Sequence, residues 1–172
     1  MKSLVIYKSK TGFTEKYANW ISNELNCDIK KYEDVSKNLV NEYDLIIYGA
    51  GVYAGKIGGL DKIKKLGIRN NKLIVFASGA TPIEAGDTID RVWKSNFSEE
   101  EIKEIPHYYM PGGISYERMA FFSKLVIKAL SKMLKKNKEM REKSGNMDLE
   151  KSYDSSSKEY IKPLVEFVRK SF

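Results

Sequence analysis

Residues with the chemistry to bind phosphate stand directly after the first apolar run of the chain. The apolar run covers residues 3–7, and it is followed by Ser9, Lys10, Thr11, Gly12, Phe13 and Thr14. This loop favours the binding of an anion. It offers hydroxyl groups, a glycine that lets the backbone come close, and the free N–H groups of a helix beginning near Thr14. The triphosphate spacing G-x-x-x-x-G-K-[ST] is absent, so a monophosphate fits better. The alternative is an ordinary helix cap, where Ser and Thr are favoured without any ligand.

Two more loops of small residues follow later apolar runs. They consist of Ala50, Gly51, Val52, Tyr53, Ala54 and Gly55 after the run at 44–50, and of Ser78, Gly79, Ala80 and Thr81 after the run at 72–78. An open parallel sheet binds ligands beyond the carboxyl ends of its strands, where the strand order reverses. We therefore expect the three loops to meet in one crevice, where Tyr53 can stack on a planar heterocycle. The alternative for Tyr53 is a ring that covers the top of the core.

A dinucleotide-binding pattern also occurs at the second loop. Gly49, Gly51 and Ala54 satisfy the relaxed spacing G-x-G-x-x-G/A after a strand. The complete fingerprint also needs an acidic residue about twenty positions later, at the end of the next strand. Residues 69–71 are Arg-Asn-Asn, and no acid ends the following run. We therefore discount this pattern and keep a nucleotide-binding regulatory domain only as a second alternative.

Apolar runs that alternate with helical patterns indicate the fold. Strands are expected at residues 3–7, 27–33, 44–50, 72–78 and 105–113, and helices near 14–25, 60–66, 83–97, 118–136 and 157–170. Uninterrupted Val, Ile and Leu runs are typical of parallel sheets with helices on both faces, and the polar run at 27–33 fits an edge strand. We therefore predict one doubly wound α/β domain over residues 1–172, in which the polar stretch 137–157 is a loop.

Composition narrows the classes of function. No apolar run is long enough to span a membrane and no signal-peptide core follows Met1, so we expect a cytoplasmic protein. A single cysteine, Cys27, and a single histidine, His107, form neither a disulfide framework nor a zinc cluster, so we expect no metal. The net charge of +7 favours a negatively charged partner or surface, and it is equally typical of a solvated lysine-rich surface. We expect no nucleic acid among the partners.

Taken together, the three loops resemble those of the flavodoxin family. The resemblance rests on Ser-x-Thr-Gly-x-Thr at 9–14, the glycine-and-aromatic loop after the third strand, and the small-residue loop after the fourth. It implies a flavodoxin-like five-stranded parallel sheet of order 2-1-3-4-5, with FMN at the switch point between strands one and three. By this resemblance, Ser9, Thr11, Gly12 and Thr14 hold the FMN phosphate, while residues 50–55 and 78–81 flank the isoalloxazine.

A narrower resemblance is to the flavodoxin-type, quinone-linked protoporphyrinogen dehydrogenases. It rests on YGAGVYAGK at 48–56, HYYMPGGISYERM at 107–119 and FFSKLVIKALSKM at 121–133. The resemblance implies work at a membrane with a quinone as electron acceptor. No dedicated catalytic acid or base can be matched to a residue of this chain. An FMN-binding electron-transfer protein is therefore the first hypothesis, and a flavin-dependent oxidoreductase of the protoporphyrinogen type is the alternative.

Charged and small residues lead to further expectations about a bound flavin. Lys10 and Lys56 should make its reduction easier, and the Ala54-Gly55 peptide should accept a hydrogen bond from the protonated flavin N5, since glycine lets that peptide turn at low cost. Residues 118–136 form a basic amphipathic pattern that can lie on an anionic membrane, at the inner face of the cell membrane. The alternative for this segment is a helix that packs on the sheet. The expected partner is a redox protein or a quinone.

Overall fold

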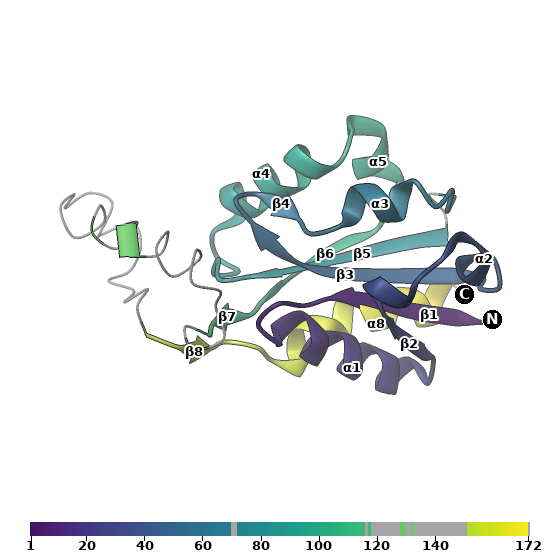
Figure 1. Ribbon diagram of the computed structural model, residues 1–172, viewed down its shortest axis with the longest axis horizontal. Helices are drawn as coiled ribbons and strands as arrows, with labels where there is room; N and C mark the ends of the chain where they lie inside the picture. Colours follow the sequence, from purple (N-terminus) through teal and green to yellow (C-terminus); the bar gives the residue numbers. More distant parts are fainter. Residues whose placement is uncertain (70–71, 116, 118–127, 130–131, 133–150, 172) are drawn as a thin grey trace.

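The apolar runs of the sequence form the strands of a parallel sheet (Figure 1). The computed structural model describes residues 1–69, 72–115, 117, 128–129, 132 and 151–171. Within these ranges, parallel pairing joins β1 (Ser3–Lys8), β2 (Asp28–Lys31), β3 (Leu45–Tyr53), β5 (Leu73–Gly79) and β6 (His107–Pro111) in the order β2-β1-β3-β5-β6. This is the predicted order 2-1-3-4-5, with the polar strand at one edge. The predicted fold class is therefore confirmed.

Helices cover both faces of the sheet (Figure 1). One face carries α1 (Phe13–Leu25) and α8 (Lys162–Ser171), and the other carries α3 (Leu60–Lys64), α4 (Gly86–Asn96) and α5 (Glu99–Glu104). The shorter elements are η1 (Tyr32–Asp34), α2 (Lys37–Val40) and η3 (Lys158–Ile161). The helices expected near 14–25, 60–66, 83–97 and 157–170 are thus present, although the third begins only at Gly86.

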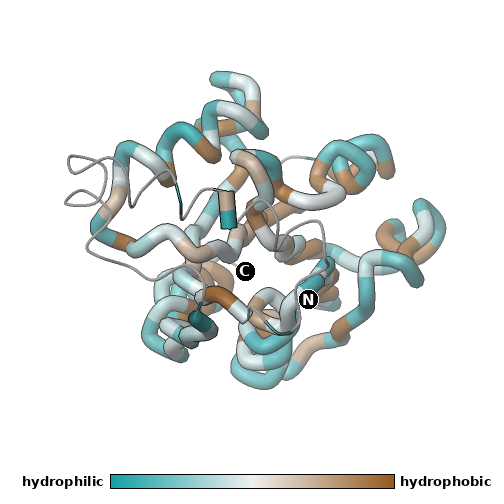
Figure 2. Tube along the Cα trace, turned by 60° about the vertical axis from the view of Figure 1, so that its left-hand side comes forward, coloured by the Kyte–Doolittle hydropathy of each residue, from teal (hydrophilic) through white to brown (hydrophobic). Residues whose placement is uncertain are grey.

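A separate hydrophobic core lies on each face of the sheet, because successive side chains of a strand alternate between its faces. In β1, Leu4 and Ile6 belong to the core beneath α3 and α4, whereas Val5 belongs to the core beneath α1 and α8. All three side chains are fully buried. Figure 2 shows hydrophilic residues over much of the outlying helices. Since the described helices cover both faces, the ends of the sheet are open to a ligand and its faces are not.

The helix α5 was not expected from the sequence. Its start is a capping box, in which Ser98 Oγ accepts a hydrogen bond from Glu101 N at 3.1 Å and Glu101 Oε2 accepts one from Ser98 N at 2.8 Å. These reciprocal bonds satisfy two N–H groups that a helix start otherwise leaves without partners. A short helix can therefore begin with only two residues between it and the end of α4.

The contacts of His107 and the burial of Cys27 both indicate a structural role. The ring of His107 is 4.7 Å from that of Trp93 and 5.7 Å from that of Phe97, measured between centroids. Cys27 is half-buried, and burial, followed by the charge of Asp28, raises the pKa of its thiol to about 11. The thiol therefore stays protonated and unreactive near neutral pH.

The chain after β3 departs from the expected loop. β3 continues to Tyr53 and pairs in antiparallel fashion with β4 (Lys56–Ile57), so that residues 50–53 are strand and only Ala54 and Gly55 form the turn. Both turn residues have left-handed backbone conformations, with φ of 48° and 77°. Two consecutive residues with positive φ are the signature of a tight hairpin, which glycine favours. The second loop is therefore a hairpin rather than an open loop.

The segment between β6 and α8 also departs in part from the expectation. β7 (Gly113–Ile114) pairs with β8 (Tyr153–Asp154), so the stretch 137–157 is not entirely a loop. Residues 137–150 of this stretch lie outside the described residues, as does most of the helix expected at 118–136, of which 128–129 and 132 are described. Within the described part of the chain, no helix is long and apolar enough to cross a membrane.

We predict that Gly49→Ala destabilises the protein by about 1–3 kcal/mol or more, the usual cost of overpacking a core. A Cβ atom at Gly49 would lie 1.9 Å from Cζ of the buried Phe76. The matched control is Gly86→Ala at the start of α4, where a Cβ atom would meet nothing within 4 Å. Urea-induced unfolding measures both variants, and equal free energies of unfolding for the two would contradict the prediction.

Candidate functional site

The first loop presents the amino end of α1 at the carboxyl end of β1. Gly12 is the N-cap residue, and its φ of 98° is a backbone conformation that residues other than glycine rarely adopt. Ser9 Oγ accepts a hydrogen bond from Gly12 N at 3.1 Å, and Gly12 O accepts the first helical bond from Lys16 N at 2.9 Å. The N–H groups of residues 13–15 therefore have no acceptor within the helix, and such groups are able to bind an anion.

Two hydroxyl groups join the first loop to the third. Thr14 Oγ1 and Ser78 Oγ are 2.7 Å apart and hydrogen-bonded, and each residue is only 3% exposed. The Thr14 side chain therefore points into the protein, toward β5, whereas Ser9 and Thr11 are half-buried at the surface. This arrangement fixes the amino end of α1 against the sheet.

The aromatic ring of Tyr53 joins the second loop to the first. It lies over Gly51, where a Cβ atom would come within 2.9 Å of the ring. Lys10 Nζ lies 4.4 Å from the ring centroid. Burial raises the pKa of the Tyr53 hydroxyl, and the nearby side chain of Thr11 offsets part of that rise. The ring is still 38% exposed, so it covers the edge of the sheet without being part of the core.

The third loop is held by tyrosines that the sequence analysis did not assign to the site. Tyr109, in β6, donates a hydrogen bond to Thr81 O and accepts one from Thr81 N, both at 3.1 Å. Tyr153, in β8, donates to Ala80 O at 3.1 Å. Gly79 lies against the second loop, because a Cβ atom there would be 3.7 Å from Cβ of Val52. The aromatic end of the fifth strand was the only sequence signal for these contacts.

Apolar groups are exposed at the same edge. Among the described residues, the large hydrophobic side chains that are exposed are those of Met1, Tyr53 and Ile83. Tyr53, 38% exposed, is the last residue of β3, and Ile83, 40% exposed, lies four residues past the end of the neighbouring strand β5. Ile83 was missed by the sequence analysis because it lies two residues past the third loop. Together the two side chains offer an apolar surface to a planar ligand.

The structure thus brings the predicted residues of all three loops together. Ala50, Gly51, Val52 and Tyr53 lie in β3, Ala54 and Gly55 in its turn, Ser78 and Gly79 at the end of β5, and Ala80 and Thr81 beyond it. The first loop contacts both of the others directly, through Tyr53 and Ser78. Lys56 differs from the expectation, because its Nζ donates to Ser95 O of α4 at 2.7 Å and so is directed away from the first loop.

A cavity of about 370 Å³ lies at the opposite end of the sheet. It is lined by residues that include Met1, Ser3 and Cys27. The charged side chains beside it are already paired, Lys2 with Glu42 at 3.7 Å and Arg169 with Glu24 at 3.4 Å. We therefore assign the functional site to the edge where the three loops meet and not to this cavity.

The comparisons with known proteins agree with this geometry. A family model for the flavodoxin domain matches residues 4–141, which is more than half of the chain and includes all three loops. This chain belongs to the flavodoxin domain family. In this flavodoxin domain, the matched region runs from β1 past β7.

Two curated relatives match part of this flavodoxin domain. An uncharacterized protein of Methanocaldococcus jannaschii is 41% identical over 88 residues, which are 48% of this chain and 57% of that protein. A flavodoxin of Maridesulfovibrio salexigens is 28% identical over 92 residues, 45% of this chain and 63% of that protein. The chain therefore spans about three fifths of the length of the curated relatives it matches.

Two solved structures of flavodoxins also match part of this chain, at lower identity. A flavodoxin from the domain Archaea is 22% identical, with 60% of this chain and 90% of that chain covered and a TM-score of 0.42. A flavodoxin of Streptococcus pneumonia is 23% identical, with 60% and 92% covered and a TM-score of 0.42.

We predict that the Thr14 and Ser78 hydroxyls stabilise the fold as a pair. Thr14→Val or Ser78→Ala alone leaves a buried hydroxyl without its partner, at a cost of about 1–3 kcal/mol. The double variant should cost less than the sum of the two, with a coupling free energy of about 0.5–3 kcal/mol. Urea-induced unfolding of the FMN-free protein measures all four proteins of the cycle. Additive effects would contradict a direct hydrogen bond.

Proposed function

We propose that this flavodoxin domain binds FMN and acts as an electron-transfer protein. The observation that supports the proposal is the contact of the three loops, which brings the amino end of α1 next to the exposed ring of Tyr53. Lys10 Nζ lies 4.4 Å from the centroid of that ring, and the side chain of Thr11 lies near its hydroxyl. An anion-binding helix end beside an apolar, planar surface matches a ligand with one phosphate and one aromatic ring system.

Each end of the site fits one part of FMN. The N–H groups of residues 13–15 and the hydroxyls of Ser9 and Thr11 would hold the phosphate. Tyr53 and Ile83 would lie against the isoalloxazine and exclude water from it. Lys10 adds a positive charge at the Tyr53 ring, which favours added negative charge nearby. Bound FMN supplies the redox chemistry itself, and the protein supplies orientation and electrostatics.

The second candidate function is a flavin-dependent oxidoreductase of the protoporphyrinogen type with a quinone acceptor. It is favoured by the motif YGAGVYAGK, which forms the end of β3, its turn and the start of β4. Turnover of protoporphyrinogen with a quinone separates this function from simple electron exchange with a reductase. A nucleotide-binding regulatory domain, the second alternative, would bind a nucleotide and leave the purified protein colourless.

The electron-transfer partner is part of the proposal. A separate redox protein or a quinone could approach the exposed side chains of Tyr53 and Ile83 at the edge of the site. Contact of residues 118–136 with an anionic membrane rests on the sequence pattern alone and stays a prediction. A cytoplasmic location with no nucleic-acid partner stays an expectation on the same grounds.

We predict that the protein binds FMN more tightly than riboflavin, which lacks the phosphate. Fluorescence titration of both ligands measures the difference, and FMN at a hundred times its dissociation constant should stabilise the fold by about 2.7 kcal/mol. A colourless protein whose melting temperature ignores added FMN would contradict the proposal.

Removal of the surface hydroxyls should weaken the binding of FMN more than that of riboflavin. Ser9→Ala and Thr11→Val should each weaken FMN by about 1.5–3 kcal/mol, the usual worth of a hydrogen bond to a charged group. Riboflavin binding is the internal control and should weaken less, since it loses only the support that Ser9 gives to Gly12 and Thr11 gives to Tyr53. Equal weakening of both ligands would mean that these hydroxyls only shape the loop.

A further inference from the structure

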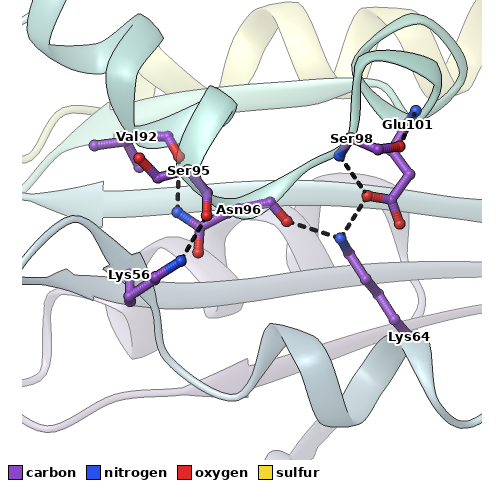
Figure 3. A network of polar contacts seen from close by, with 7 residues as sticks. All are labelled: Lys56, Lys64, Val92, Ser95, Asn96, Ser98 and Glu101. Atoms are coloured by element: carbon purple, nitrogen blue, oxygen red, sulfur yellow. Dashed lines mark hydrogen bonds and ion pairs between the residues drawn. The ribbon is translucent and has the colours of Figure 1, made fainter.

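The hairpin between β3 and β4 is tied to the carboxyl end of α4 by the amide side chain of Asn96. Asn96 Nδ2 donates to Gly55 O at 2.7 Å, and Asn96 Oδ1 accepts from Ile57 N at 3.0 Å. The same Nδ2 also donates to Val92 O at 2.7 Å, one turn back along α4 (Figure 3). The amide thus holds the hairpin on both sides of Lys56 and is itself aligned by its own helix.

Two lysines from other elements fix the end of α4 that carries Asn96 (Figure 3). Lys64 Nζ, in α3, donates to Asn96 O and pairs with Glu101 Oε2, both at 2.7 Å. Lys56 Nζ, in β4, donates to Ser95 O at 2.7 Å. The last carbonyls of a helix have no partner within it, and positive charge is favourable at that end. The position of Asn96 is therefore fixed from α3 and β4 as well as from α4.

The turn that Asn96 holds carries backbone strain. Ala54 has φ 48°, a left-handed conformation that is unfavourable for a residue with a Cβ atom. Such a conformation persists only where the surrounding structure imposes it. The bonds from Asn96 fix the carbonyl of the Gly55–Lys56 peptide and the N–H of Ile57, whereas the Ala54–Gly55 peptide receives no bond from Asn96. The tether therefore leaves the Ala54–Gly55 peptide as the part of the hairpin that can turn.

We propose that Asn96 is a positioning residue that tunes the redox potential of bound FMN through this hairpin, an inference that rests on the proposed function. Ala54 O can accept a hydrogen bond from flavin N5 only when that nitrogen carries a proton, that is, only after the flavin has been reduced. This hydrogen bond would therefore favour reduction. The hydrogen bond forms at little entropic cost if the rest of the hairpin is already fixed. Asn96 provides that fixation without contact with the flavin, so its loss should change the potentials more than the affinity.

The test uses the full chain loaded with FMN and two substitutions of Asn96. Asn96→Leu keeps a side chain of similar shape and removes all three hydrogen bonds, and Asn96→Ala removes the same bonds with less bulk. Ser95→Ala is the matched control, because Ser95 Oγ donates to Arg91 O at 2.7 Å, a bond of the same span on the same helix. This control removes a side-chain bond at the end of α4 and leaves the hairpin untouched.

Both one-electron potentials of bound FMN are measured by anaerobic titration with dithionite and reference dyes. We expect the potential for adding the first electron to fall by about 59 mV in both Asn96 variants, because the hairpin is no longer fixed for its hydrogen bond. This shift corresponds to a tenfold change in a one-electron equilibrium. Ser95→Ala should leave it unchanged, and FMN affinity should vary less than tenfold. In the FMN-free protein, hydrogen exchange at Ile57 N should be at least tenfold faster in both Asn96 variants, because its acceptor is lost.

The outcomes separate this inference from the proposed function. If the wild type binds FMN and the Asn96 variants lower only the melting temperature, with both potentials unchanged, the tether is merely structural and the inference is wrong. The same holds if Ser95→Ala shifts the first potential as much as Asn96→Leu does. If the wild type binds no FMN, the proposed function is wrong, and the role assigned to Asn96 fails with it.

Discussion

The parallel pairing of β1 with β3 and of β3 with β5 is the constraint on which the candidate site depends. Its register sets Lys8 opposite Ala50 and Gly51 opposite Ser78, so the loops leave neighbouring strands at nearly the same level. Short side chains from the first and third loops can then reach one another. Thr14 and Ser78 do so through a buried hydrogen bond of 2.7 Å. A shift of one residue would turn every side chain of β3 to the other face of the sheet and separate these groups.

Tyrosine hydroxyls hold the chain where it leaves this edge of the sheet. The hydroxyls of Tyr17, Tyr48, Tyr109 and Tyr153 donate to the carbonyls of Pro111, Gly58, Thr81 and Ala80, respectively. Burial raises the pKa of all four tyrosines, so each hydroxyl remains a donor even at alkaline pH where an exposed tyrosine loses its proton. A phenol ring packs against apolar groups while its hydroxyl reaches a carbonyl that the sheet leaves without a partner. The loops are therefore fixed from the core outward.

The sequence predicts those features whose causes are local. Runs of Val, Ile and Leu define the strands, and the small residues that follow them define the loops, because each signal lies within a few positions. The hairpin at Ala54 was not predictable in this way, since small residues at 50–53 are typical of a loop and only pairing with β4 makes them a strand. Asn96 and Tyr153 were missed because their partners are 41 and 73 positions away. Neither residue differs locally from an ordinary helix end or surface tyrosine.

The two ends of the candidate site differ in how firmly they are held, and this difference bears on how a ligand could enter. The helix end is rigid, because the buried bond of Thr14 to Ser78 joins it to the sheet. Tyr53, by contrast, has a cation–π contact with Lys10 and lies near the side chain of Thr11, and it is 38% exposed. An exposed cation–π contact is worth only about 0.5–1 kcal/mol. The Tyr53 ring can therefore move for a planar ligand at small cost, while the groups that would bind its phosphate stay in place.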